Sequence, residues 1–308
     1  MKCLDMKQAK RHHYIPQFLI RNFVNEQDKI FVYDKIQKKI YETSSLNVFL
    51  ENERNTFENI QGEKDDIIEQ IYADLDSTFA PILRKVTITG KMNGEDKKML
   101  LFLAYIIKWR VPQYDDSFKN AKDFFTIDDL GLGIKQDNTK LDVDLESFFN
   151  SEMSQESKRF LLAIQPFRFE KERKEILDNS FLISTPYPAL LGDCPFNEIQ
   201  IKSDEFFEDF IFPISNWLNL VYSKRIDILS FSDFLKNGDE KQSDKFLQDF
   251  SIARDLGMIH LAQRQVSCSD ISYLKYMVKS YNEIPQQALK YMMNSAVFTV
   301  LYEYIKEQ

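Results

Sequence analysis

Two of the three histidines in this 308-residue chain stand side by side near its amino terminus, in the stretch RHHYIPQFLIRNF. Histidine titrates near neutral pH, so His12 and His13 suit general acid–base chemistry. Neighbouring histidines point about 100° apart on a helix and to opposite faces of a strand, which makes them a weak metal signal. Pro16 suits the first turn of a helix, and we expect a short helix over residues 16–23 directly after the pair.

Polar side chains around the pair suggest a binding role. Arg11 and Arg21 flank the histidines and can hold a phosphate or a carboxylate. Gln17 shares a helix face with Arg21, and we count both, with Arg11, as candidate ligand-binding residues. The alternative is that the histidines only cap the helix and bond backbone carbonyl groups.

The opening stretch resembles the first block of the family known as domain of unknown function 4238, whose members start with a His-His-Tyr-x-Pro-Gln-Phe-like sequence. Three further short blocks are similar to that family in the same order: WRVP at 109–112, GDCPF at 192–196 and FPIS at 212–215. The likeness spans residues 11 to about 265. Cys194 departs from the polar residue expected at its place, and residues 114–157 and the last helix have no counterpart.

The resemblance implies a fold in which these blocks form a pocket. It also implies an effector role, as a toxin or an abortive-infection protein with a phage trigger, because some members lie among bacterial and phage-borne defence genes.

The blocks supply a plausible catalytic set. Arg110 ends a predicted helix, where a cation is favoured by the helix dipole, and Asp193 follows Gly192 in a turn expected to expose its carboxylate at a sheet edge. With His12 and His13 they suffice for metal-independent cleavage of an RNA phosphodiester. One histidine accepts the 2′-OH proton, the other protonates the leaving oxygen, and the arginine stabilises the developing charge. The alternative is that Arg110 and Asp193 form a buried ion pair.

A second candidate pair is Arg254 and His260, which resembles the Arg-and-His motif of the dimeric, all-helical HEPN ribonucleases. Six residues apart on one helix, the two side chains do not share a face. The alternative is a surface arginine and a half-buried histidine.

Composition limits the function classes. A net charge of −8 and a pI of about 5.2 argue against a protein that coats duplex nucleic acid. The three cysteines, Cys3, Cys194 and Cys268, are far apart and predict a reducing, cytoplasmic location without a disulfide framework or zinc site. The most apolar run, residues 99–107, is too short to span a bilayer. We expect no membrane segment, metal or cofactor.

Periodicity predicts one α+β domain over residues 1–308, mainly helical with a small antiparallel sheet. Alternation over 29–43 predicts a hairpin, and strand signals recur at 181–185 and 210–223. Helical spacing marks 65–86, with a break or kink at Pro81, then 97–110, 158–177 and three segments between 232 and 308. The C-terminal helices, from about 270 to 308, are core or an oligomer face, and a homodimer is compatible with them.

Two functional hypotheses follow. The first is a cytoplasmic effector enzyme that cleaves RNA without a metal, with His12, His13, Arg110 and Asp193 at its centre. The second is a non-catalytic sensor whose same pocket holds a phosphate-bearing ligand or a partner protein.

Overall fold

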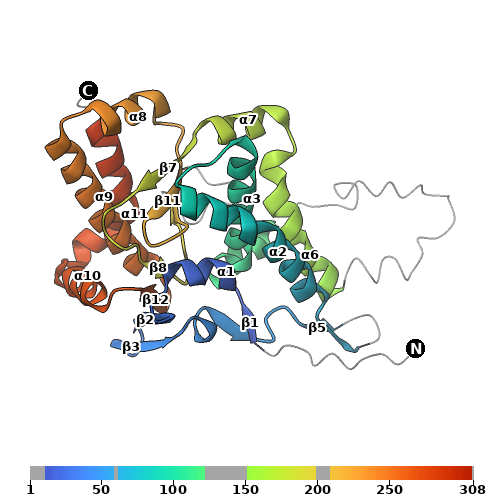
Figure 1. Ribbon diagram of the computed structural model, residues 1–308. Helices are drawn as coiled ribbons and strands as arrows, with labels where there is room; N and C mark the ends of the chain where they lie inside the picture. Colours follow the sequence, from blue (N-terminus) through green and yellow to red (C-terminus); the bar gives the residue numbers. More distant parts are fainter. Residues whose placement is uncertain (1–10, 59–61, 122–150, 199–208, 307–308) are drawn as a thin grey trace.

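A computed structural model describes residues 11–58, 62–121, 151–198 and 209–306 and shows a mainly helical α+β fold with small antiparallel sheets (Figure 1). Its α-helices are α1 (Gln17–Ile20), α2 (Ile67–Thr89), α3 (Gly94–Arg110), α4 (Asp115–Ala121), α6 (Glu152–Ile164), α7 (Glu170–Asp178), α8 (Ile228–Asn237), α9 (Glu240–Leu261), α10 (Ile271–Glu283) and α11 (Gln286–Lys306). Short 3₁₀ helices are η1 (Arg21–Phe23), η2 (Ser45–Asn47), η3 (Pro112–Tyr114) and η6 (Gln165–Phe167).

The strands form two four-stranded and two two-stranded antiparallel sheets within the described residues. The larger sheets have the orders β7-β11-β10-β9 and β3-β2-β12-β8, and β1-β4 and β5-β6 form the small ones. The strands are β1 (Arg11–His13), β2 (Lys29–Asp34), β3 (Lys39–Ser44), β4 (Leu50–Asn52), β5 (Phe57–Glu58), β6 (Lys64–Asp65), β7 (Ser180–Ser184), β8 (Leu191–Gly192), β9 (Asn197–Glu198), β10 (Phe210–Pro213), β11 (Leu218–Tyr222) and β12 (Gln265–Cys268).

The sheet that contains β7 lies between two helical layers (Figure 1). Successive residues of a strand point to opposite faces, and β10 follows this rule. Phe210 and Phe212 join the cluster that includes the buried side chains of α3, whereas Ile211 joins the cluster formed with α8, α9 and α11. Both faces of this sheet are therefore buried, which explains its nearly continuous apolar strands.

The helix α3 begins and ends at residues that carry clear sequence signals. Asn93 and Asp96 form a reciprocal capping box at its start, with the Asn93 side chain accepting the Asp96 N–H at 2.8 Å. The chain then becomes extended at Val111, the residue before Pro112, and the helix ends at Arg110. This helix end places Arg110 and Pro112 at the same corner of the molecule.

Pro81, where a break or kink was expected, does not end α2. The helix runs on to Thr89, because buried side chains lie on both sides of Pro81, among them Tyr72, Phe79, Leu83 and Val86. Burial of this stripe compensates for the hydrogen bond that proline removes.

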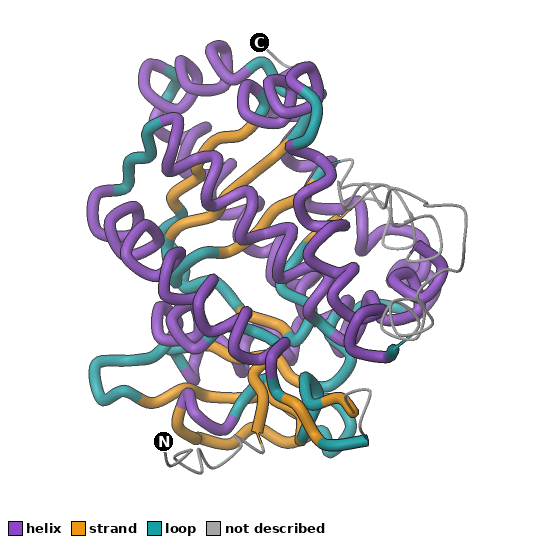
Figure 2. Tube along the Cα trace, turned by 90° about the vertical axis from the view of Figure 1, so that its right-hand side faces the viewer, coloured by secondary structure: helices purple, strands orange, loops and turns teal. Residues whose placement is uncertain are grey.

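The carboxyl-terminal region contains four helices, α8 to α11, rather than three, with β12 inserted between α9 and α10. That strand pairs with β2 from the start of the chain, Val266 lying opposite Tyr33. Figure 2 shows two groups of strands separated along the molecule by crossing helices. Within the described residues, no helix is long and apolar enough to cross a bilayer.

Candidate functional site

The two adjacent histidines lie in β1 and face opposite sides of it. β1 pairs antiparallel with β4, and His12 lies opposite Glu51. His12 is fully buried, and its Nδ1 accepts the backbone N–H of Asn55 at 2.9 Å. Nδ1 of His12 is therefore an acceptor in this bond. Neither histidine caps α1, whose start has no side-chain cap.

His13 is half-buried and held by Gln17. The Gln17 side-chain amide donates to Nε2 of His13 at 2.6 Å and to the carbonyl oxygen of Ser45 at 2.8 Å. Burial, and then the positive charge of Arg110, lower the pKa of His13 from 6.5 to about 4, while a hydrogen bond with the Leu46 backbone acts in the opposite direction. His13 is therefore neutral at pH 7.

Arg110 is buried against α2. Its Nη1 lies 3.2 Å from both carboxylate oxygens of Asp76, and its guanidinium stacks on the ring of Tyr72 at 4.3 Å. The sequence offered a buried pair between Arg110 and Asp193 as the structural alternative. In the structure each is buried, but the ion-pair partner of Arg110 is Asp76.

Asp193 is buried, and the expectation that the turn would expose its carboxylate is wrong. The carboxylate accepts the backbone N–H groups of Gln263, Arg264 and Gln265 at 2.8, 2.7 and 2.8 Å. It is enclosed because β8 pairs with β12, so the segment that enters β12 wraps around the side chain. Burial raises the pKa of Asp193, while these backbone bonds and the charge of Lys35 oppose the rise.

Three of the four sequence blocks meet at a pocket of about 480 Å³, which we call the opening-block pocket. The opening block contributes Tyr14, the second block Pro112 and the third block Asp193. The complete lining is Tyr14, Ile36, Asn47, Phe49, Leu50, Glu51, Pro112, Asp193, Gln263, Arg264 and Gln265. The side chains of His12, His13 and Arg110 lie outside this lining.

The fourth block contacts the end of the opening block. Asn22 donates its side-chain amide to the carbonyl oxygen of Ile214 at 3.0 Å, and its own carbonyl accepts the N–H of Asn216 at 3.2 Å. This contact joins residues that are 192 positions apart in the sequence. The second, third and fourth blocks are thus all assembled around the opening segment.

A family model, protein of unknown function (DUF4238), matches residues 11–241. The chain belongs to the DUF4238 family. The match ends before residue 265, where the resemblance was expected to end, and it includes all four blocks. No curated protein and no solved structure matches the chain.

The expected ligand-binding residues have different surroundings in this DUF4238 chain. Arg11 is exposed and donates to the Leu46 carbonyl oxygen at 3.3 Å and to Oδ1 of Asn47 at 3.1 Å, beside the opening-block pocket. The side-chain amide of Gln17 is hydrogen-bonded to His13, as described above. Arg21 is exposed on η1 and is not one of the residues that line the pocket.

Sequence reasoning missed Tyr14, Glu51 and Arg264. Tyr14 stands next to His13 in the block already quoted, so its position was a usable signal. Burial raises the pKa of Tyr14, with the charges of Asp193 and Glu51 adding to the rise. Glu51 and Arg264 carry no local signal. Glu51 reaches the pocket because β4 pairs with β1, and Arg264 reaches it because β12, which follows it directly, pairs with β8.

A second, smaller pocket of about 220 Å³ adjoins the first through an ion pair. Arg54 lines it and contacts Glu51 of the opening-block pocket at 2.8 Å. Arg54 also makes a two-point contact with Asp115 at 2.7 and 3.1 Å, and Arg159 contacts the same carboxylate at 3.1 Å. The arginines of this second pocket are thus neutralised by carboxylates of the chain.

Arg254 and His260 are not brought into one cleft. Arg254 is fully buried and binds both carboxylate oxygens of Asp255 at 2.8 Å. His260 is half-buried, and its Nδ1 lies 3.2 Å from the hydroxyl oxygen of Tyr281. Burial and the neighbouring Lys35 lower the pKa of His260. The alternative of a surface arginine is wrong for Arg254, and that of a half-buried histidine is confirmed for His260.

The described residues contain no cluster of three or more His, Cys, Asp or Glu side chains suited to a metal ion. Cys194 and Cys268 are buried free thiols. The opening-block pocket instead offers two carboxylates, a phenol, a guanidinium and several amide groups, a set suited to hydrogen bonding of a polar organic ligand.

Proposed function

We propose that the protein is a cytoplasmic sensor that binds a nucleotide-like, phosphate-bearing ligand in the opening-block pocket. The observation that carries the proposal is the partly exposed guanidinium of Arg264 at this pocket, of which, among the described residues, only Nε is bound, by Asp34. Arg264 is 55% exposed, and its Nε donates to Asp34 at 3.0 Å. Its two terminal nitrogens have no hydrogen bond with any described residue, so both can bind a phosphate in a two-point contact.

The other groups of the pocket suit the remainder of a nucleotide. Glu51 is 43% exposed and its carboxylate accepts hydrogen bonds, so it favours a sugar hydroxyl or a base amino group. A volume of about 480 Å³ falls within the usual range for small-ligand sites. Arg11, which bonds Asn47 of the lining, adds a second positive charge nearby.

RNA cleavage is the second candidate function, because His13 lies close enough to Arg110 for their charges to interact. We rank it below binding for two reasons. His12 is fully buried, out of reach of a substrate, and His13 is hydrogen-bonded with a pKa of about 4, so His13 does not resemble a general acid or base tuned to neutral pH. An effector role in defence against phage, triggered by a ligand, by RNA or by a partner protein, is compatible with either function.

Calorimetric titration of the full chain with the four common ribonucleoside monophosphates, and with the corresponding nucleosides, tests the binding proposal. We expect at least one monophosphate to bind more tightly than its nucleoside. Arg264→Gln should weaken the monophosphate at least about tenfold, which equals about 1.4 kcal/mol. Arg225→Gln is the matched control, because Arg225 is 59% exposed and also faces an aspartate, Asp209, at 3.9 Å.

Two results would overturn the proposal. One is no binding of any monophosphate at millimolar concentration, and the other is equal binding by wild type and Arg264→Gln. Incubation with a labelled RNA oligonucleotide tests the second candidate function, RNA cleavage. Cyclic phosphate ends made by wild type and not by a folded His13→Ala protein would replace the sensor function with a ribonuclease.

A further inference from the structure

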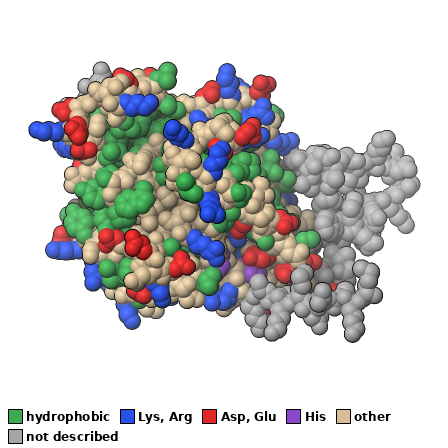
Figure 3. All heavy atoms as spheres, viewed as in Figure 1, with side chains coloured by type: hydrophobic (Ala, Val, Ile, Leu, Met, Phe, Trp, Pro, Cys, Tyr) green, Lys and Arg blue, Asp and Glu red, His purple; other side chains and the backbone are tan. Residues whose placement is uncertain are grey.

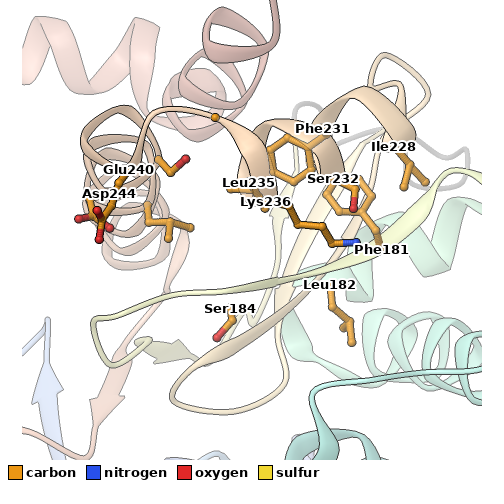
Figure 4. A pocket seen from close by; sticks show the side chains of 13 residues that line it. Phe181, Leu182, Ser184, Ile228, Phe231, Ser232, Leu235, Lys236, Glu240 and Asp244 are labelled. Carbon is orange, nitrogen blue, oxygen red and sulfur yellow. The ribbon is translucent and has the colours of Figure 1, made fainter.

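β7 (Ser180–Ser184) is an edge strand whose outer side faces a groove. It is the first strand in the order β7-β11-β10-β9, and among the described residues it pairs only with β11. The groove has a volume of about 690 Å³ and lies between β7 and the helices α8 and α9 (Figure 4). Its lining is Phe181, Leu182, Ser184, Ile228, Phe231, Ser232, Leu235, Lys236, Gly238, Glu240, Ser243, Asp244 and Leu247.

The backbone groups on the outer side of β7 can be assigned from the pairing register. Thr185 donates to Trp217 and Ser223 donates to Asn179, which marks both pairs as hydrogen-bonded. Because hydrogen-bonded pairs alternate in an antiparallel ladder, residues 181 and 183 bond β11, and residues 182 and 184 direct N–H and C=O outward. The outward groups of Leu182 and Ser184 have no hydrogen bond within the part of the chain that the structure describes.

Nothing in the sequence of β7 protects this edge. Native edge strands are usually blunted by charges or proline, and β3, the edge of the other large sheet, carries Lys39 and Glu42. The sequence of β7 is SFLIS, which contains neither a charged residue nor a proline. An open, apolar edge beside a helical groove is the arrangement that binds an added peptide strand.

Charges at the groove indicate the chemistry and direction of that strand. In Figure 4, Lys236 of α8 reaches towards β7 near Phe181 and Leu182, while Glu240 and Asp244 of α9 lie at the other end of the groove. Figure 3 shows hydrophobic side chains gathered over the part of the molecule where Figure 1 places α8 and α9. An antiparallel strand would enter at the acidic end and leave beside Lys236.

We propose that the groove between β7 and α8–α9 binds an extended segment of a partner protein as an added antiparallel strand. The segment has basic residues at its amino end, alternating apolar residues in its middle and acidic residues at its carboxyl end. Outward N–H and C=O groups of Leu182 and Ser184 supply the main-chain bonds, and the apolar lining takes alternate side chains. This site is separate from the opening-block pocket and does not depend on its ligand.

Ser184 offers a sharp test, because its outward N–H can be deleted without touching the ladder to β11. Ser184→Pro removes this donor, proline is tolerated on edge strands, and the preceding residue is already extended. Ser184→Ala is the matched control, since it removes the exposed hydroxyl and keeps the N–H. The probe is a fluorescein-labelled octapeptide with two lysines, four alternating valines and threonines, and two glutamates, in that order.

Fluorescence anisotropy with the full chain should show binding by wild type and Ser184→Ala, and at least tenfold weaker binding by Ser184→Pro. The same peptide with its charges reversed end for end should bind more weakly to wild type, and Lys236→Glu should weaken the original peptide. Equal binding by Ser184→Pro and Ser184→Ala, or equal binding of both peptides, would overturn the proposal. So would absence of binding by wild type.

Two further outcomes identify another occupant and equally overturn the proposal. A dimer that is present in wild type and lost in Ser184→Pro, by light scattering, would show that a second copy covers the edge. Slow hydrogen exchange at Leu182 and Ser184 in the free monomer would show that the chain covers its own edge. Exchange of both amides that slows only when the octapeptide is added is the supporting result.

Discussion

The ammonium nitrogen of Lys108 lies 2.9 Å from Oε1 of Glu198, and the two side chains are 1% and 2% exposed. The second carboxylate oxygen accepts the Tyr114 hydroxyl at 2.6 Å. Burial raises the pKa of Glu198, while Lys108 and Tyr114 oppose the rise. This group joins α3 to β9 and η3, directly behind the corner that carries Arg110 and Pro112, so it holds the second sequence block in place.

Loss of one partner of this pair should strongly lower the stability of the protein. Lys108→Met leaves the Glu198 carboxylate buried without its counter-charge, and we expect the free energy of unfolding to fall by about 3–5 kcal/mol. Urea unfolding followed by circular dichroism measures the change. The double variant Lys108→Met with Glu198→Met removes both charges and should lose less than Lys108→Met alone.

The control for this prediction is an exposed pair of the same kind. Lys64 and Glu53 lie 2.8 Å apart with side chains 53% and 48% exposed, and Lys64→Met should change the free energy of unfolding by less than about 1 kcal/mol. Equal effects of Lys64→Met and Lys108→Met would show that burial does not govern the Lys108–Glu198 pair.

The lowered pKa of His13 predicts how stability depends on pH. The pKa is 6.5 in the unfolded chain and about 4 in the folded protein, so between these values the unfolded chain binds more protons. Stability contributed by His13 is therefore present above pH 6.5 and is lost as the pH falls towards 4. Because the side chain is half-buried, we expect about 1–2 kcal/mol across this window, less than the full shift would give.

His13→Gln isolates this contribution, since glutamine does not titrate and can still accept from Gln17. Unfolding midpoints of both proteins at several pH values should show a shallower dependence for His13→Gln between pH 4 and 6.5. Parallel curves for the two proteins would contradict a depressed pKa and would restore His13 as a group able to exchange protons near neutral pH.

The local parts of this fold follow from neighbouring residues. The hairpin predicted at 29–43 is β2 and β3, the strand signals at 181–185 and 210–223 are β7, β10 and β11, and the helix predicted at 97–110 is α3. The helical segment expected at 158–177 is divided into α6 and α7 by η6, which contains Pro166. Each has a signal within a few positions, such as alternation, a capping box or a proline after an extended residue.

The site could be predicted only in part, because its remaining residues are joined by distant pairing. β12 has four residues and pairs with β2, more than 200 positions earlier, and with β8, more than 70 positions earlier. The burial of Asp193 follows from that pairing, since the N–H groups that enclose it belong to residues 263–265. Sequence blocks thus indicated which segments meet, while the contacts of each side chain depended on a strand without a local signal.

The last prediction concerns Arg254 and His260, the pair that resembled a ribonuclease motif. Arg254 also donates to Thr185 at 3.1 Å and to Asn219 at 3.2 Å, and it joins α9 to the sheet that contains β7. Arg254→Lys cannot keep the two-point contact with Asp255, so we expect a loss of about 2–4 kcal/mol in the free energy of unfolding. His260→Ala removes one half-buried hydrogen bond and should cost less than about 1.5 kcal/mol.

The two substitutions therefore separate a structural pair from a catalytic one. If Arg254 and His260 acted together on RNA, both variants would lose cleavage to the same extent, and His260→Ala would do so while remaining folded. If Arg254 serves the fold, Arg254→Lys unfolds at clearly lower urea concentration, and His260→Ala shows a smaller loss of stability and no change in binding. The wide difference expected in unfolding midpoint follows from full burial of Arg254 against half-burial of His260.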